Sequence, residues 1–109
     1  MKLELSIVIP AYNESSRLAE PLREVINFVT SSKLNAEIIV VDDGSSDNTA
    51  KVAENVFAEF SDIASRVIRY EQNRGKGFAV KTGLLAANAD LALFTDADLS
   101  TPIEEMHKL

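Results

Sequence analysis

The chain has no cysteine, a single histidine and few basic residues among its 109 positions. Without cysteine it cannot form disulfides, thiolate metal sites or a cysteine nucleophile. Lys and Arg number 11 against 17 Asp and Glu, which gives a net charge of -6. An acidic chain without a concentrated basic patch repels polyanions, so we expect no nucleic-acid partner.

Long apolar runs are also missing. No apolar stretch reaches the roughly 18 residues of a membrane-spanning helix, and residues 1–4 resemble no signal peptide. We therefore expect a cytoplasmic protein. Hydrophobic residues still make up 46% of the chain, as in ordinary folded proteins. The length allows one domain at most and is short for an enzyme that holds two substrates, so we expect residues 1–109 to be an incomplete domain.

Apolar segments of strand length alternate with segments of helical period. The pattern predicts strands over residues 3–9, 36–41, 66–71 and 90–95, and helices over residues 19–32, from 46 or 47 to 60, and from 75 or 77 to 88. Pro10 should stop the first strand, because proline cannot donate to a sheet ladder. In the first helix Leu22, Val25, Ile26 and Val29 share one face, which predicts packing against the sheet.

Strands that alternate with helices indicate right-handed crossovers and a parallel sheet covered on both faces. We expect a Rossmann-like α/β/α sandwich of three layers with the sheet order 3-2-1-4. In such sheets ligands lie outside the carboxyl ends of the strands, where the winding reverses. Polar segments follow all four predicted strands, at residues 10–14, 42–47, 73–77 and 96–98. We therefore expect these four segments to converge on one crevice.

Residues 94–102 read FTDADLSTP, so the fourth strand ends in Asp96 and Asp98. Carboxylates two residues apart at a strand end point the same way, which suits a hard cation that bridges a diphosphate. The alternative is an acidic turn that caps a helix beginning at Pro102.

The other three segments also have two interpretations each. Residues 12–14 form either part of a binding site or a helix-entry turn. Asp42 and Asp43 are adjacent carboxylates that repel each other and need a compensating partner, which favours a functional site over a plain loop. Residues 73–77, NRGKG, place two cations on a glycine-rich helix start, which suits an anion; the alternative is a flexible basic turn.

Two common phosphate-binding motifs are excluded. There is no Walker run of the form G-x-x-x-x-G-K-[ST]. The dinucleotide fingerprint would need glycine where Val80 stands, and it would follow the first strand instead of the third.

Taken together, four motifs resemble family 2 glycosyltransferases of the GT-A fold. They are IVIPAYNE at residues 7–14, VVDDGSSDNT at 40–49, NRGKG at 73–77 and DAD at 96–98. The form DADLSTP, with its Gly-Lys-Gly loop, is most similar to the dolichyl-phosphate β-glucosyltransferase branch, whose relatives use polyprenyl phosphates. The resemblance covers the N-terminal, nucleotide-sugar-binding portion of that domain. Acceptor-binding segments and any catalytic base would lie beyond Leu109, so no catalytic residue is identified.

The resemblance also implies roles for individual residues at the nucleoside end of the site. The nucleobase and ribose would be framed by Pro10, Ala11, Tyr12 and Glu14. Asp43, or its neighbour Asp42, would accept a hydrogen bond from the base.

At the diphosphate end, the resemblance implies that Lys76 approaches the base or the phosphates. Asp96 would contact the ribose or a metal-bound water. Asp98 would ligate Mg²⁺ or Mn²⁺ between the donor phosphates, where the metal neutralises charge on the departing nucleoside diphosphate.

The implied reaction transfers a sugar from a nucleotide sugar to a polyprenyl or dolichyl phosphate, with inversion at the anomeric carbon. The expected donor is UDP-glucose, and GDP-mannose is the alternative. An ionised phosphate is already nucleophilic near neutral pH, so it depends less on a general base than a sugar hydroxyl does. We expect the 109-residue chain itself to bind the donor without turnover. In the full-length enzyme we expect peripheral contact with the cytoplasmic face of the membrane.

Two other functions compete with this one. A phosphoacceptor receiver domain is also a parallel α/β protein with clustered aspartates, but its acidic pair would follow the first strand, where this chain has Pro10 and Ala11. The second alternative is a non-catalytic nucleotide-binding module. We also expect a homodimer, because the apolar fourth strand would lie at a sheet edge that invites pairing with another chain.

Overall fold

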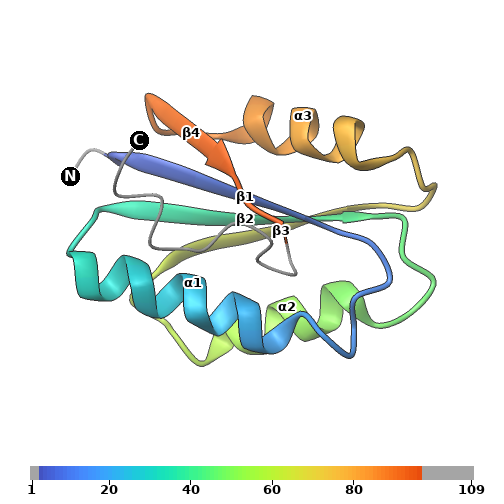
Figure 1. The fold of residues 1–109 in the computed structure, drawn as a ribbon, viewed down its shortest axis with the longest axis horizontal. Helices are drawn as coiled ribbons and strands as arrows, with labels where there is room; N and C mark the ends of the chain where they lie inside the picture. The colour runs from blue at the N-terminus through green and yellow to red at the C-terminus, as the bar shows by residue number, and fades with distance from the viewer. Residues whose placement is uncertain (1–2, 97–109) are drawn as a thin grey trace.

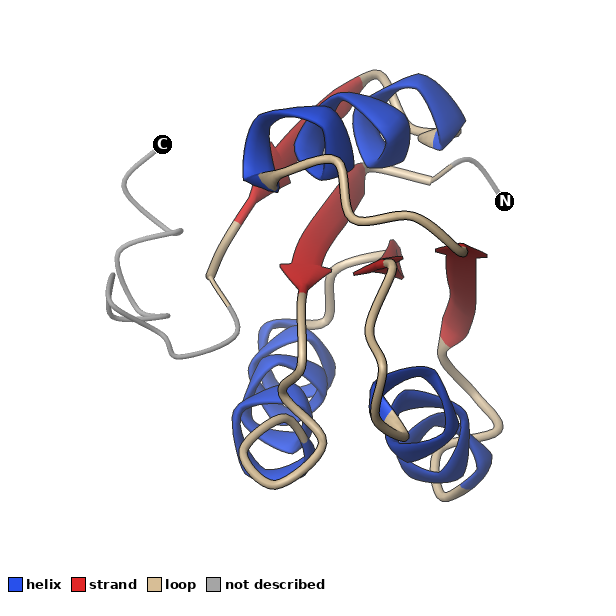
Figure 2. Cartoon of the chain, turned by 90° about the vertical axis from the view of Figure 1, so that its right-hand side faces the viewer, coloured by secondary structure: helices blue, strands red, loops and turns tan. Residues whose placement is uncertain are grey.

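The computed structural model describes residues 3–96, which form three layers (Figure 1). The elements are β1 (Leu5–Ala11), α1 (Ala19–Ser32), β2 (Ala36–Asp43), α2 (Thr49–Ala58), β3 (Ala64–Tyr70), α3 (Lys76–Ala86) and β4 (Leu91–Phe94). All neighbouring strands are parallel and their order is β3-β2-β1-β4, which confirms the predicted 3-2-1-4 sheet. Helices α1 and α2 cover one face and α3 covers the other (Figure 2).

The two central strands, β1 and β2, form the middle of the core. Every residue in both strands is buried, as expected for strands covered on two faces. The buried residues include four polar ones, Ser6, Glu37, Asp42 and Asp43. The predicted face of α1 is confirmed, because its buried residues are Leu22, Val25, Ile26 and Val29. This packing gives the carboxyl ends of the central strands a rigid base.

Pro10 does not end the first strand, so that prediction was wrong. β1 continues through Pro10 to Ala11. The carbonyl of Val8 accepts a hydrogen bond from Thr95 N at 3.0 Å, so Val8 and Pro10, two residues apart, both face the β4 side. Because β4 ends at Phe94, opposite Val8, no neighbouring strand needs an N–H from Pro10.

The second strand is also longer than predicted. β2 runs through Asp42 and Asp43 instead of ending at Val41. Both carboxylates therefore come from a strand that is paired on each side, with Ala11 next to Asp42 and Tyr70 next to Asp43. The sheet itself, and not a loop, positions them.

Helix α3 packs on the sheet through small residues. Its buried positions are Ala79 and Gly83, and a Cβ atom on Gly83 would lie 2.3 Å from Cγ1 of Val8. The helix axis can therefore approach β1 closely. Its larger apolar residues, Phe78 and Leu85, are exposed instead.

A buried carboxylate fixes the connection between α3 and β4. Glu37 accepts hydrogen bonds at Oε2 from Ser6 Oγ (2.6 Å) and Asn88 N (2.7 Å), and Ser6 Oγ in turn accepts one from Ala89 N at 3.1 Å. Burial alone would raise the pKa of Glu37, but the hydrogen bonds from Ser6 and Asn88 outweigh it and lower the pKa below its ordinary value. The ionised side chain thus anchors the segment that leads into β4.

Candidate functional site

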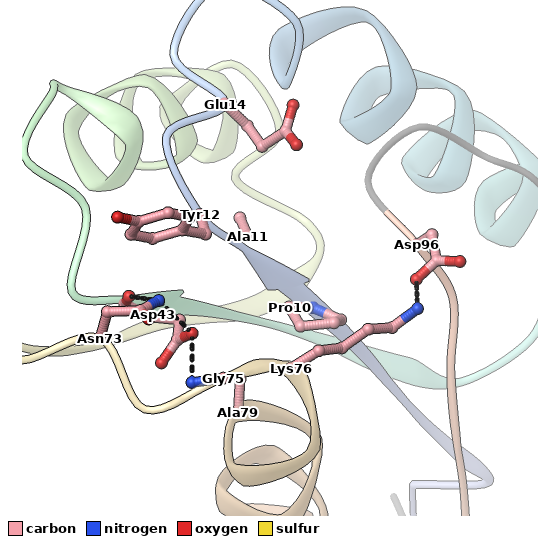
Figure 3. A pocket seen from close by; sticks show the side chains of 10 residues that line it. All are labelled: Pro10, Ala11, Tyr12, Glu14, Asp43, Asn73, Gly75, Lys76, Ala79 and Asp96. Atoms are coloured by element: carbon pink, nitrogen blue, oxygen red, sulfur yellow. Dashed lines mark hydrogen bonds and ion pairs between the residues drawn. The ribbon is translucent and has the colours of Figure 1, made fainter.

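A pocket of about 450 Å³ opens at the carboxyl ends of the strands (Figure 3). Its lining residues are Pro10, Ala11, Tyr12, Glu14, Asp43, Asn73, Gly75, Lys76, Ala79 and Asp96. They come from the ends of β1 and β2, the loop before α3, the first turn of α3, and the residues after β4. The four polar segments therefore meet where the sheet winding reverses, as the topology predicts.

Hydrogen bonds join the loop after β1 to the loop after β2. Asn13 N donates to Ser45 Oγ at 2.8 Å, and Ser46 N donates to Asn13 Oδ1 at 2.9 Å. Glu14 N donates to Thr49 Oγ1 at 2.9 Å. Asn13 adopts a left-handed backbone conformation, φ 51°, which asparagine tolerates well. Residues 12–14 are therefore more than a helix-entry turn, since they bind a second loop.

Asp47 extends this contact to the start of α2. Its carboxylate accepts hydrogen bonds from Ser15 N at 3.2 Å and Thr49 N at 3.0 Å, and also from the Thr49 hydroxyl. The Thr49 hydroxyl is the main reason that the pKa of Asp47 lies below its ordinary value, and Ser15 adds to the effect. The N-cap of α2 is Asn48, whereas the sequence indicated residue 46 or 47 as the start of this helix. Asp47 still accepts the N–H of Thr49, the first helical residue, and holds the opposite loop as well.

Asp43 organises the loop between β3 and α3. Its Oδ1 accepts hydrogen bonds from the Tyr70 hydroxyl (2.5 Å) and Arg74 N (2.9 Å), while Oδ2 accepts from Asn73 Nδ2 (2.8 Å) and Gly75 N (2.9 Å). Burial and the bond to Asp43 raise the pKa of the Tyr70 hydroxyl well above its ordinary value, so the hydroxyl remains a donor at neutral pH. This one carboxylate orders the loop that leads to Lys76.

Gly44 allows the two loops to touch. Its φ is +70°, and a Cβ atom there would lie 2.4 Å from the backbone N of Asn73. A side chain would have to overlap the neighbouring backbone, and the conformation itself disfavours L residues. Glycine is therefore required at this position for Asp43 to reach its partners.

Asp42 does not line the pocket, although the sequence places it in the candidate site. Adjacent residues of a strand point to opposite faces, and Asp42 is completely buried on the face away from Asp43. Its Oδ1 accepts a hydrogen bond from Ser45 N at 3.0 Å, and its Oδ2 lies 3.6 Å from Arg69 Nε. Each carboxylate thus points to its own face and has its own partners, which offset the repulsion expected between the two charges.

Lys76 and Asp96 form an ion pair across the pocket (Figure 3). The Lys76 ammonium also lies 5.7 Å from the centre of the Phe94 ring. The predicted anion-binding cation and one predicted metal-site carboxylate therefore face each other. Asp98, the other predicted ligand, lies outside the described residues. Within residues 3–96 no group of three or more acidic, His or Cys side chains is placed to hold a metal ion.

Three lining residues, Asn73, Gly75 and Ala79, were not among the site residues predicted from the sequence. Asn73 and Gly75 belong to the NRGKG motif, but only the cation Lys76 was assigned there. The contact of Asn73 with Asp43 depends on how two loops pack, which no local pattern signals. Ala79 faces the pocket because α3 begins at Lys76, one turn earlier.

The fold and the pocket together define an α/β protein of the class that binds ligands at the carboxyl edge of a parallel sheet. The family model described as Glycosyl transferase family 2 matches residues 6–109, so the chain belongs to that family. The resemblance found in the sequence is confirmed. A receiver domain, the competing signalling function, is thereby set aside.

Known relatives extend this result. The chain is 37% identical over 110 residues to a dolichyl-phosphate beta-glucosyltransferase of Dictyostelium discoideum, an alignment that covers 96% of the chain and 34% of that protein. It is 39% identical over 106 residues to the undecaprenyl-phosphate 4-deoxy-4-formamido-L-arabinose transferase of Proteus mirabilis, covering 97% of the chain and 32% of that protein. The chain thus spans about a third of the length of these relatives.

A solved structure with the same fold carries ligands. It is glucosyl-3-phosphoglycerate synthase from Mycobacterium tuberculosis in complex with Mn²⁺, uridine diphosphate and phosphoglyceric acid, with a TM-score of 0.67 and 28% identity. The match covers 87% of this chain and 33% of that one. The likeness places the described sheet in the GT-A fold, as expected.

Proposed function

We propose that the chain is the donor-binding part of a glycosyltransferase that transfers glucose from UDP-glucose, with inversion, to a polyprenyl or dolichyl phosphate. The pocket at the carboxyl ends of β1, β2 and β4 carries the proposal, because it gathers the motif residues into one concave site. The names of the relatives support the lipid-phosphate acceptor, and the uridine diphosphate in the structural neighbour supports the donor.

The pocket residues suit a nucleoside diphosphate in this orientation. Tyr12, with 47% of its surface exposed, offers an aromatic face at the pocket rim on which a base can stack. Pro10 and Ala11 line the pocket beneath it, and Glu14 offers a carboxylate to the ribose hydroxyls. Lys76 supplies the positive charge that a diphosphate needs at the start of α3.

A divalent metal fits the charge of the site. Asp96 places a carboxylate in the pocket beside the Lys76 ammonium, and oxygen ligands of this kind suit Mg²⁺ or Mn²⁺. Asp96 and Asp98 would hold the ion. When bound, it neutralises charge on the departing nucleoside diphosphate.

The acceptor oxygen would attack the anomeric carbon opposite the diphosphate, so that the new bond forms as the old one breaks and the configuration inverts. An ionised acceptor phosphate needs no proton removed. We propose that the 109-residue chain alone binds the donor without turnover, as a nucleotide-binding module, because it spans only about a third of the length of the transferases that it matches. No helix within residues 3–96 is long and apolar enough to cross a membrane. We also propose a cytoplasmic location, with peripheral membrane contact in the whole enzyme.

Calorimetric titration of the chain with UDP-glucose tests the donor site. We expect binding that requires Mn²⁺ and that is weakened at least about tenfold in Asp98→Asn, because the substitution removes a charged metal ligand. GDP-mannose should bind more weakly than UDP-glucose.

Asp62→Asn is the matched control for this titration. Asp62 is exposed at the other end of the sheet, so its loss changes the net charge equally without touching the pocket. Its affinity should equal that of the unmodified chain. Failure of UDP-glucose to bind a folded chain in the presence of Mn²⁺ would overturn the proposal.

We further propose that the chain dimerises through β4. Among residues 3–96 this strand pairs with β1 on one side only, and Leu91 and Phe94 are 56% and 48% exposed. An open apolar edge favours pairing with a second copy. Light scattering should give twice the monomer mass, and Leu91→Lys should give the monomer mass, since a charge at the edge blocks pairing. A monomeric unmodified chain would contradict this prediction.

A further inference from the structure

We propose that the outer side of α3 is a docking surface for an anionic lipid bilayer. We call this surface the α3 stripe, and it consists of Arg74, Phe78, Lys81 and Leu85. The inference rests on the proposed function and deepens it, because it says which part of the chain makes the peripheral membrane contact. The stripe is distinct from the donor pocket, since none of its four residues lines that pocket.

The residues of the α3 stripe follow one another at helical spacing. Their numbers rise by four, three and four, so they fall on one side of the helix. Arg74 precedes the helix, but its guanidinium carbon lies 5.3 Å from the centre of the Phe78 ring, which keeps the cation on the same side. The stripe therefore alternates a cation with a large apolar side chain along its length.

The apolar members of the stripe are turned to solvent. Phe78 is 43% exposed and Leu85 is 78% exposed, because the small residues Ala79 and Gly83 occupy the buried side of the helix. The Phe78 ring is held in place by a T-shaped contact with Tyr70, with ring centres 5.3 Å apart. Two large apolar side chains about two turns apart on one helix side exceed the scattered exposure of an ordinary surface.

The charge of the stripe is opposite in sign to that of the chain. Helix α3 contains no acidic residue, although the chain has a net charge of -6. The nearest acidic residues in the sequence are Glu71 and Asp90, outside the helix at either end. Within residues 3–96 no salt bridge engages Arg74 or Lys81. Both cations therefore keep their charge available for an anionic surface.

The other face of the sheet has the opposite character. Helices α1 and α2 cover it (Figure 1) and expose Glu20, Glu24 and Glu54. Neither of these two helices has an exposed large apolar side chain. An anionic bilayer would therefore repel this face and attract the α3 stripe, which gives the chain one preferred orientation on the bilayer.

The mixture of groups in the stripe fits a bilayer surface. Phe78 and Leu85 would enter the boundary between head groups and acyl chains, while Arg74 and Lys81 would pair with lipid phosphates. Helix α3 begins at Lys76, which lines the donor pocket. A helix that lies on the bilayer would therefore bring the pocket beside the lipids, where the proposed lipid-phosphate acceptor is held.

Co-sedimentation with vesicles measures this contact. Vesicles of phosphatidylcholine with about a third phosphatidylglycerol are compared with vesicles of phosphatidylcholine alone. We expect the unmodified chain to bind the anionic vesicles at least about tenfold more tightly than the neutral ones. Salt at about 0.5 M should remove most of this difference, because it screens exposed charges.

Two variants test the stripe itself. Lys81→Glu should weaken binding to the anionic vesicles at least about tenfold, because a repelled charge replaces an attracted one. Leu85→Ser should weaken it about fivefold, since an apolar group that enters the bilayer is lost. Lys51→Glu is the matched control. Lys51 is exposed on α2, on the other face of the sheet (Figure 2), so the same change of charge there should alter binding by less than about twofold.

The remaining outcomes contradict the inference. Absence of binding to anionic vesicles would overturn it, as would equal losses in Lys81→Glu and Lys51→Glu. If Lys81→Glu and Leu85→Ser instead convert a dimer to a monomer in light scattering, and no vesicles are bound, the stripe is an interface between two copies and the inference is wrong.

Calorimetry with UDP and Mn²⁺ on the same preparations separates this inference from the proposed donor site. Lys81 and Leu85 do not line the pocket, so both variants should bind UDP as the unmodified chain does. UDP binding without vesicle binding would overturn the docking surface alone. Vesicle binding by a chain that does not bind UDP would overturn the donor site and leave the docking surface in place.

Discussion

Asp43→Asn should lower the free energy of unfolding by about 2–4 kcal/mol and weaken UDP binding at least about thirtyfold. An asparagine has the same shape, but one of its two positions carries an NH₂ group. If that group replaces Oδ1, it faces Arg74 N, and if it replaces Oδ2, it faces Gly75 N. Either orientation sets donor against donor, so the loop before α3 loses its anchor. Urea unfolding and calorimetry measure the two effects.

Asp42→Asn is the matched control for this substitution. Asp42 is equally buried and adjacent, but its carboxylate accepts one hydrogen bond, from Ser45 N to Oδ1. The amide oxygen of an asparagine can keep that bond. The NH₂ group then takes the place of Oδ2, which accepts no hydrogen bond within the described residues, so the substitution removes only the 3.6 Å ion pair with the exposed Arg69 side chain. The variant should lose less stability and keep its affinity for UDP. Equal losses in the two variants would show that Asp43 has no special role.

Gly44→Ala is the second substitution with a large expected effect. The added methyl group would lie 2.4 Å from Asn73 N in a backbone conformation that alanine disfavours, φ +70°. The backbone of the neighbouring loop must move away, which breaks its bonds to Asp43. We expect a loss of about 2–4 kcal/mol in the free energy of unfolding and at least tenfold weaker UDP binding. Thermal unfolding and calorimetry measure the two effects.

Gly77→Ala provides the comparison, because it makes the same chemical change in an open helical position. Gly77 lies in α3, and a Cβ atom there has no neighbour within 4 Å. Alanine is the better helix former, so this variant should gain about 0.5–1 kcal/mol. A loss of stability at Gly77, or no loss at Gly44, would contradict the contact that we describe between the two loops.

The sequence was sufficient to predict the sheet order and the position of the pocket. Both depend on the alternation of strands and helices and on polar residues at strand ends, which are local patterns. The face of α1 was equally predictable from the spacing of Leu22 and Val29. The end of β1 was not, because Pro10 is tolerated only where β4 has already stopped, and that depends on a partner far along the chain.

The sequence predicted most of the residues that line the site, but not the contacts between them. Lys76 and Asp96 could be assigned to the site, but not to an ion pair with each other. The separation of Asp42 from Asp43 follows from strand alternation once β2 is known to include both. The contact of Gly44 with Asn73 joins two loops that no periodicity relates, so only the packed structure reveals it.

The hydrogen bonds between the loops after β1 and β2 have a consequence for how such a site can change. Asn13 is hydrogen-bonded to Ser45 and Ser46, and Glu14 N donates a hydrogen bond to the Thr49 hydroxyl. Each loop therefore depends on the other for its shape. A family member that acquires a new sequence in one loop must acquire a compatible sequence in the other. If residues 10–14, PAYNE, were transferred alone to another protein, they would lack the loop that holds them in shape. The two motifs must therefore change together.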